Sequence, residues 1–252
     1  MLKSLRLFVF LSLILLQACS KYSLQPANIS DENPNKAAIY NTQLGLLYLK
    51  NGDKKRAKYK ILSALKQAPK NAEANLAFAY LLEKNGDVGK ARLYYNKALK
   101  YAPKNGVVLN NYGAFLCRKG DYKKAEFYFL QAVDDIDYIE TAAAFENAGL
   151  CLAASGENKK AIFYFEKALR EDSKRKQAFF ELIHLELKEE HYKKAFATME
   201  KYLKFIDDKK SLKLAIFIAK KAGQIDAQNR YEKQLKLAEH SGVEHESNSR
   251  NG

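Results

Sequence analysis

Ala38–Asn71 reads AIYNTQLGLLYLKNGDKKRAKYKILSALKQAPKN. Its pattern of small, aromatic, turn and proline residues returns after 34 residues, and then again after another 34. A fourth copy follows a two-residue insertion at Glu140-Thr141, and weaker copies continue as far as Tyr231. Equivalent positions in the four strong copies are Gly45, Ala79, Gly113 and Gly149, then Gly52, Gly86, Gly120 and Gly156, then Ala57, Ala91, Ala125 and Ala161, and last Ala64, Ala98, Ala132 and Ala168.

This pattern predicts two short helices in each copy. Gly52 and its equivalents can close the first helix in the left-handed conformation. Asp53, Asp87 and Asp121 can cap the second helices by accepting from their free N–H groups. Pro69 and Pro103 end the second helices, because proline has no N–H to donate. The 34-residue spacing resembles the tetratricopeptide repeat. The resemblance implies an all-α, right-handed superhelical solenoid of about six repeats, whose first helices line a concave face.

The N-terminus indicates export. Lys3 and Arg6 precede an apolar run, 7–16, that is too short to span a bilayer, so residues 1–18 are interpreted as a signal peptide. Leu16-Gln17-Ala18-Cys19 resembles the bacterial lipobox. That resemblance implies acyl chains on Cys19, and outer-membrane rather than inner-membrane sorting, because Ser20 is not aspartate. An ordinary secretion signal with a chance cysteine is the alternative.

The remaining boundaries follow from composition. Residues 19–37 contain Pro26 and Pro34 with little apolar periodicity, which predicts a flexible tether. The solenoid is expected over 38–240. Residues 241–252 are polar and have no periodic face, so we expect a disordered tail.

Two cysteines besides Cys19, Cys117 and Cys151, fall on the first helices of neighbouring repeats. An exported protein meets an oxidising compartment, where a disulfide persists. We therefore expect a Cys117–Cys151 bond, the alternative being two small buried thiols.

Charge and composition favour binding over catalysis. The net charge of +14 invites a nucleic-acid partner, but the export signal argues against one, and basic surface near a membrane can instead favour anionic lipid, cell-wall polymer or an acidic partner. The histidines (His184, His191, His240 and His245) have no companions at metal-ligand spacing, and no paired carboxylates face each other. We expect no catalytic residue, metal, cofactor or small-molecule substrate.

The stretches Asn110–Cys117 and Glu146–Cys151, with the lipobox, tether and repeat number, resemble the type IV pilus biogenesis lipoprotein family, the pilotin of the pilus secretin. The resemblance implies a non-enzymatic protein on the periplasmic face of the outer membrane that binds secretin subunits and promotes their assembly into a multimer. An outer-membrane adaptor for cell-wall synthesis or barrel assembly is one alternative, and a peptidoglycan hydrolase or wall-binding module is another.

In this repeat type, inward-pointing first-helix positions form the partner groove. Here they are Ile39, Thr42, Leu46, Leu49, Leu76, Tyr80 and Glu83. So apolar an inward face indicates a protein ligand. The alternative is that these residues cover the tether or pack within the fold.

Overall fold

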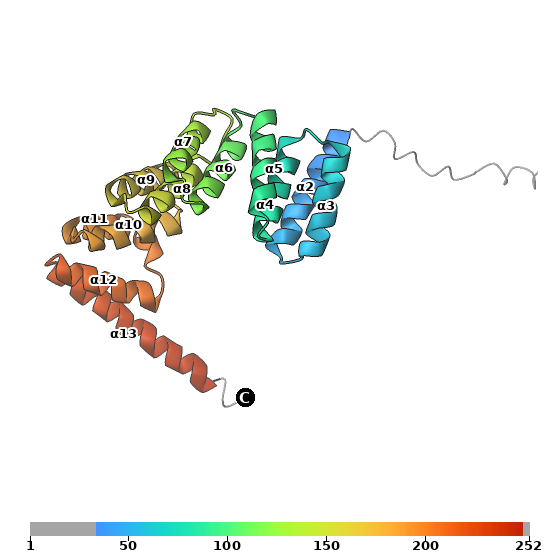
Figure 1. The fold of residues 1–252 in the computed structure, drawn as a ribbon. Helices are drawn as coiled ribbons and strands as arrows, with labels where there is room; N and C mark the ends of the chain where they lie inside the picture. The colour runs from blue at the N-terminus through green and yellow to red at the C-terminus, as the bar shows by residue number, and fades with distance from the viewer. Residues whose placement is uncertain (1–33, 249–252) are drawn as a thin grey trace, which may run out of the picture. The chain divides into compact units, whose positions relative to one another are not determined.

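The computed structural model describes the backbone of residues 34–248 and the side chains of 35–239. This part of the chain contains twelve α-helices and one short 3-10 helix, in six consecutive pairs (Figure 1). The elements are α2 (Pro34–Lys50), α3 (Lys54–Gln67), α4 (Ala72–Lys84), α5 (Val88–Tyr101), α6 (Gly106–Arg118), α7 (Tyr122–Val133), α8 (Thr141–Ala154), α9 (Asn158–Glu171), α10 (Lys176–Lys188), α11 (Tyr192–Lys201), η2 (Leu203–Phe205), α12 (Lys209–Lys221) and α13 (Ile225–Asn248).

The chain divides into two compact units, residues 1–69 and 70–252. Of the first unit the structure describes one helix pair, α2 and α3. The second unit holds the other five pairs, α4 to α13.

The turns inside the pairs follow the sequence prediction. Gly52, Gly86, Gly120 and Gly156 all have φ between 79° and 85°, in the left-handed region where a Cβ is disfavoured. Asp53 and Asp87 cap α3 and α5 by accepting from Arg56 N and Lys90 N. Asp121 makes no such bond, and its carboxylate instead pairs with Lys124 at 3.0 Å.

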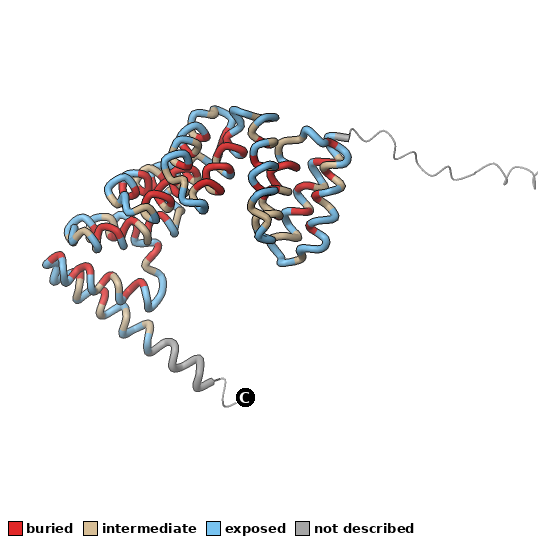
Figure 2. Tube along the Cα trace, in the orientation of Figure 1, coloured by how far each residue is buried: buried red, intermediate tan, exposed pale blue. Residues whose placement is uncertain are grey.

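Small residues let the helices of each pair approach closely. A Cβ on Gly113 would lie 2.9 Å from the Phe129 ring, and one on Gly149 would lie 2.7 Å from the Phe165 ring. Bulk at either position would therefore push the second helix away. The buried residues lie along the faces where paired helices meet (Figure 2).

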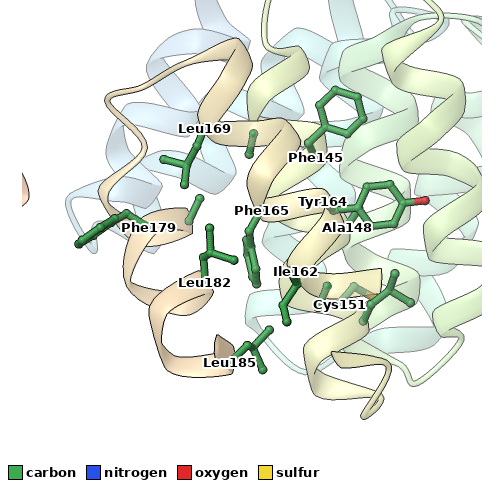
Figure 3. Packing of buried hydrophobic residues seen from close by; sticks show 14 of the residues in the cluster. Phe145, Ala148, Cys151, Ile162, Tyr164, Phe165, Leu169, Phe179, Leu182 and Leu185 are labelled. Carbon is green, nitrogen blue, oxygen red and sulfur yellow. The ribbon is translucent and has the colours of Figure 1, made fainter. Parts of the chain in front are cut away.

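In the second unit, most of the buried residues form one hydrophobic cluster from α4 to α13, and Leu109, Ala132, Tyr138 and Ala144 form a smaller one. Figure 3 shows part of the larger cluster, where Phe165 of α9 packs with Leu182 of α10. The weak fifth and sixth copies join the larger cluster through Ala195, Tyr202 and Tyr231, all buried. Stacking therefore supplies the burial that a short isolated helix lacks.

The helices extend past both ends of the expected solenoid. Proline suits the first turn of a helix, and α2 begins at Pro34, inside the expected tether. Helix α13 continues to Asn248, so part of the expected disordered tail is helical. The repeat pattern marks packed positions, and a helix can continue beyond them. The signal peptide and Cys19 lie outside the described residues, within which we find no helix with the length and apolar character to cross a membrane.

Candidate functional site

Helix α2 carries an exposed apolar surface. Ile39, Tyr40, Leu46 and Leu47 are between 36% and 67% exposed, although a leucine or isoleucine in a packed helix is usually buried. We call these four residues the α2 apolar surface. It contains Ile39 and Leu46, two of the residues expected to bind a partner.

The other face of α2 packs on α3. Ala38, Thr42 and Gly45 are buried there, against Ala57, Ile61 and Ala64 of α3. A Cβ on Gly45 would lie only 2.5 Å from Cγ1 of Ile61.

Thr42 was expected in the groove, but its side chain is 2% exposed, and this part of the prediction is wrong. Its hydroxyl donates to the Ala38 carbonyl at 2.8 Å, so the residue is satisfied within its own helix turn. Leu49 is partly buried.

The prediction that Leu76 of α4 lines the partner groove is also wrong. Leu76 is 8% exposed and belongs to the core cluster with Ala79, Ala91 and Tyr95. Tyr80 is partly buried, and the ammonium of Lys84 lies 5.2 Å from its ring centroid.

Glu83 lies in a polar network inside the second unit. Its carboxylate accepts from Arg118 Nε at 2.7 Å and Nη2 at 2.8 Å, and from the Tyr95 hydroxyl at 3.0 Å. Burial works to raise the pKa of Glu83, but the hydrogen bonds and charge of Arg118 outweigh it and lower the pKa. Burial, reinforced by Glu83, raises the pKa of Tyr95. The network ties α4 and α5 to α6, so the Glu83 carboxylate is already engaged within the fold.

The two cysteines are joined in the structure. Cys117 on α6 and Cys151 on α8 form a disulfide with Cα atoms 5.7 Å apart. Nearer the N-terminal ends of the same helices, Asn147 Nδ2 donates to Asn110 Oδ1 at 3.0 Å. Both contacts come from the two stretches that carry the family resemblance, and both hold the third repeat to the fourth.

The loop 134–140, between α7 and α8, exposes two isoleucines that the repeat pattern does not indicate. Ile136 is 98% exposed and Ile139 is 91% exposed. The loop is ordered by its other residues. Asp135 Oδ2 accepts from Gly106 N at 2.6 Å, and Tyr138 is buried against Gly106, Leu109 and Ala132. The spacing of Ile136, Tyr138 and Ile139 matches neither a helix nor a strand. The sequence therefore does not predict which of the three side chains is buried, and the structure shows that it is Tyr138.

The His, Cys, Asp and Glu side chains of the described residues form no group of three or more that could hold a metal ion. His184 and His191 are exposed, and the side chains of His240 and His245 lie outside the described residues.

One carboxylate is unusual. Glu186 of α10 is fully buried, and burial raises its pKa to about 7 against the pull of Lys194 at 3.8 Å.

Comparison with known proteins defines the class. Tetratricopeptide-repeat models match residues 42–106 and 106–170. The all-helical pairs and these matches identify a tetratricopeptide-repeat protein, a class built for protein interaction. No curated protein sequence matches the chain.

Solved structures narrow the class. PilF of Pseudomonas aeruginosa is 31% identical, with a TM-score of 0.68, over 88% of this chain and 100% of PilF. PilW, a widely conserved type IV pilus biogenesis factor, is 30% identical, with a TM-score of 0.65, over 81% of this chain and 94% of PilW. MamA of Desulfovibrio magneticus, at 20% identity and a TM-score of 0.53 over 67% of this chain and 94% of that chain, shares the fold. The chain belongs to the family of PilF and PilW.

Proposed function

We propose that this protein is a lipid-anchored scaffold of the outer membrane that binds subunits of the type IV pilus secretin and promotes their assembly into a multimer. It has no bond-making chemistry of its own in this proposal. The observation that carries it is the α2 apolar surface, on a chain of the PilF and PilW family.

The α2 apolar surface suits a polypeptide partner. Its four large side chains lie on one helix as two pairs seven residues apart, which is about two helical turns, and an extended apolar segment of the partner can cover both pairs. Covering such side chains contributes roughly 25 cal/mol for each Å² of apolar area removed from water. The surface would shield an apolar segment of a secretin subunit until the subunit joins its neighbours.

The anchor rests on the motif Leu16-Gln17-Ala18-Cys19. Several acyl chains on one cysteine give lasting membrane attachment, where a single chain gives only reversible binding. Confinement to the membrane surface raises the effective concentration of a partner that inserts in the same membrane.

The experiment substitutes one exposed residue and measures secretin multimers. Leu46→Asp puts a charge in the α2 apolar surface without touching the core, since Leu46 is 41% exposed. We expect loss of secretin multimers in cells, with the protein still folded and in the membrane fraction. Leu237→Asp, on α13, is the matched control, since Leu237 is also exposed.

Co-purification from detergent-solubilised outer membrane identifies the partner. Secretin subunits captured by the parent chain and lost with Leu46→Asp support the proposal. Normal multimers in that variant would remove the α2 apolar surface from the mechanism. Capture of cell-wall synthases or barrel-assembly proteins in place of secretin would favour the adaptor alternative.

A further inference from the structure

The outward face of α3 combines lysines with exposed apolar groups. Lys55, Tyr59, Leu62 and Lys66 follow one another at steps of four, three and four residues, so they share one side of the helix. That side lies opposite the buried residues Ala57, Ile61 and Ala64. Tyr59 is 69% exposed and Leu62 is 41% exposed, with a lysine on either side along the helix.

The charge around this face is almost entirely positive. Between Pro34 and Pro69 the chain has eight lysines and arginines and one carboxylate, Asp53. Asp53 is already occupied, because it caps α3 and pairs with Arg56 at 2.6 Å. Among the described residues, Lys55, Lys58 and Lys66 have no carboxylate within ion-pair distance.

The equivalent helices are less suited to an anionic surface. Helix α5 has Gly89 and Asn96 where α3 has Lys55 and Leu62. Helix α7 and helix α9 carry carboxylates that pair with lysines of the next repeat, Glu126 with Lys160 at 3.1 Å and Glu166 with Lys194 at 2.8 Å. Helix α3 therefore places two exposed apolar side chains, Tyr59 and Leu62, between unneutralised lysines, where α5 has Leu93 and Asn96.

We propose that the α3 face binds the surface of an anionic phospholipid membrane, with Tyr59 and Leu62 at the level of the headgroups and the lysines against lipid phosphates. Tyrosine favours this interface because its ring is apolar and its hydroxyl is polar. Lysines beside it gain from the negative surface potential.

Chain length is consistent with this contact. From Cys19 to Pro34 is a stretch of about 15 residues, which can span at most about 50 Å. If Cys19 carries the acyl chains of the proposed function, the pair α2 and α3 cannot leave the vicinity of the bilayer. The contact would fix which side of the pair faces lipid. The proposed function enters this proposal only through the anchor, which keeps α3 close to the bilayer. The residues that bind the lipid are those of the α3 face.

The test uses the chain from Cys19 onward with Cys19→Ser, so that no acyl group contributes. Its sedimentation with vesicles of phosphatidylethanolamine and phosphatidylglycerol is compared with that on phosphatidylcholine alone. We expect binding to the anionic vesicles that weakens as salt is raised. Lys55→Gln, Lys58→Gln and Lys66→Gln together should lower the affinity about 100-fold, since each lysine near a charged surface contributes roughly fivefold.

The matched control removes the same charge from α12, with Lys209→Gln, Lys213→Gln and Lys220→Gln, and should change the affinity less than about threefold. Tyr59→Ser with Leu62→Ser should lower it about tenfold. Circular dichroism verifies that each variant remains helical.

Unchanged binding by the α3 lysine variant, an equal loss from the α12 variant, or equal binding to phosphatidylcholine would each overturn the proposal. Retention on isolated peptidoglycan without vesicle binding would overturn it as well. Leu46→Asp separates this proposal from the proposed function. If that variant keeps its vesicle affinity while secretin capture is absent even from the parent chain, only the proposed function fails.

Discussion

Cys117 and Cys151 are 34 residues apart and bonded, although the repeat that separates their helices has 36 residues here. Gly113 and Gly149 mark that longer spacing, so Cys117 follows its glycine by four residues and Cys151 follows its glycine by two. The bond therefore lies at the one joint between strong copies where the repeat length changes. Asn110 and Asn147 add a hydrogen bond at the same joint.

Removing this bond should loosen the middle of the second unit. The closed loop of 34 residues corresponds to about 4 kcal/mol of stabilisation by the chain-entropy relation. We expect Cys117→Ala with Cys151→Ala to lower the free energy of unfolding by up to that amount. Thermal unfolding of the parent chain should respond to reductant, whereas unfolding of the double variant should not. The same melting temperature for the parent chain with and without reductant would contradict the expectation.

Neighbouring residues of the 134–140 loop should differ sharply in their effect on stability. Tyr138→Ala empties the space over Gly106 and should cost about 3 kcal/mol or more. Ile136→Ser with Ile139→Ser alters side chains that are almost fully exposed and should change stability by less than about 0.5 kcal/mol. Urea unfolding measures both. Equal losses would mean that the isoleucines are covered in solution.

Glu186 should make stability depend on pH. Its pKa is about 7 when folded, against an ordinary 4.5, so the folded chain binds an extra proton between these values. The contribution of Glu186 to the free energy of unfolding is therefore largest below about pH 4.5. It falls as the pH rises to about 7, by up to about 3 kcal/mol in total. The charged form is poorly satisfied. Oε1 accepts from Thr198 at 3.2 Å, while Oε2 has no partner among the described residues.

Glu186→Gln should flatten this part of the pH profile and raise stability above pH 7. Glu181→Gln, on the same helix and partly exposed, should leave the parent profile intact. Chemical unfolding at a series of pH values measures all three chains. A Glu186→Gln profile that still falls between pH 4.5 and 7 would assign the effect to another group.

Glu190 occupies a turn position that suits glycine. Its φ is 57°, and Gly156 occupies the same place in the preceding pair with φ of 85°. An L side chain in this region is disfavoured by roughly 1–2 kcal/mol. We expect Glu190→Gly to raise the melting temperature and the free energy of unfolding by about 0.5–1 kcal/mol, and Gly156→Ala to lower the latter by about 1 kcal/mol. A lower melting temperature for Glu190→Gly would show that the turn tolerates its side chain.

Local features were predictable from the sequence because their causes are local. The left-handed glycines, the Asp53 and Asp87 caps and the ends of α3 and α5 before Pro69 and Pro103 depend on a few adjacent residues, and the structure confirms them. The weak fifth copy also folds as a pair, although Glu190 replaces its turn glycine.

The faces of the helices were harder to assign. Thr42 and Leu76 are buried while Tyr40 and Leu47 are exposed, because burial depends on which neighbouring helix covers each turn. The Glu83–Arg118 pair joins residues 35 apart in sequence, and only the stacking of helices brings them together. The exposed Ile136 and Ile139 stand where the preceding copy has Ala102 and Asn105, so the repeat pattern does not indicate an apolar surface there.

A protease that cuts the loop 134–140 would leave its products attached to each other. The exposed Ile136 and Ile139 make this a favourable place for cleavage, and both sides of the cut lie between Cys117 and Cys151. The nicked molecule would migrate as a single band on a denaturing gel without thiol, and as two shorter bands once a thiol is added.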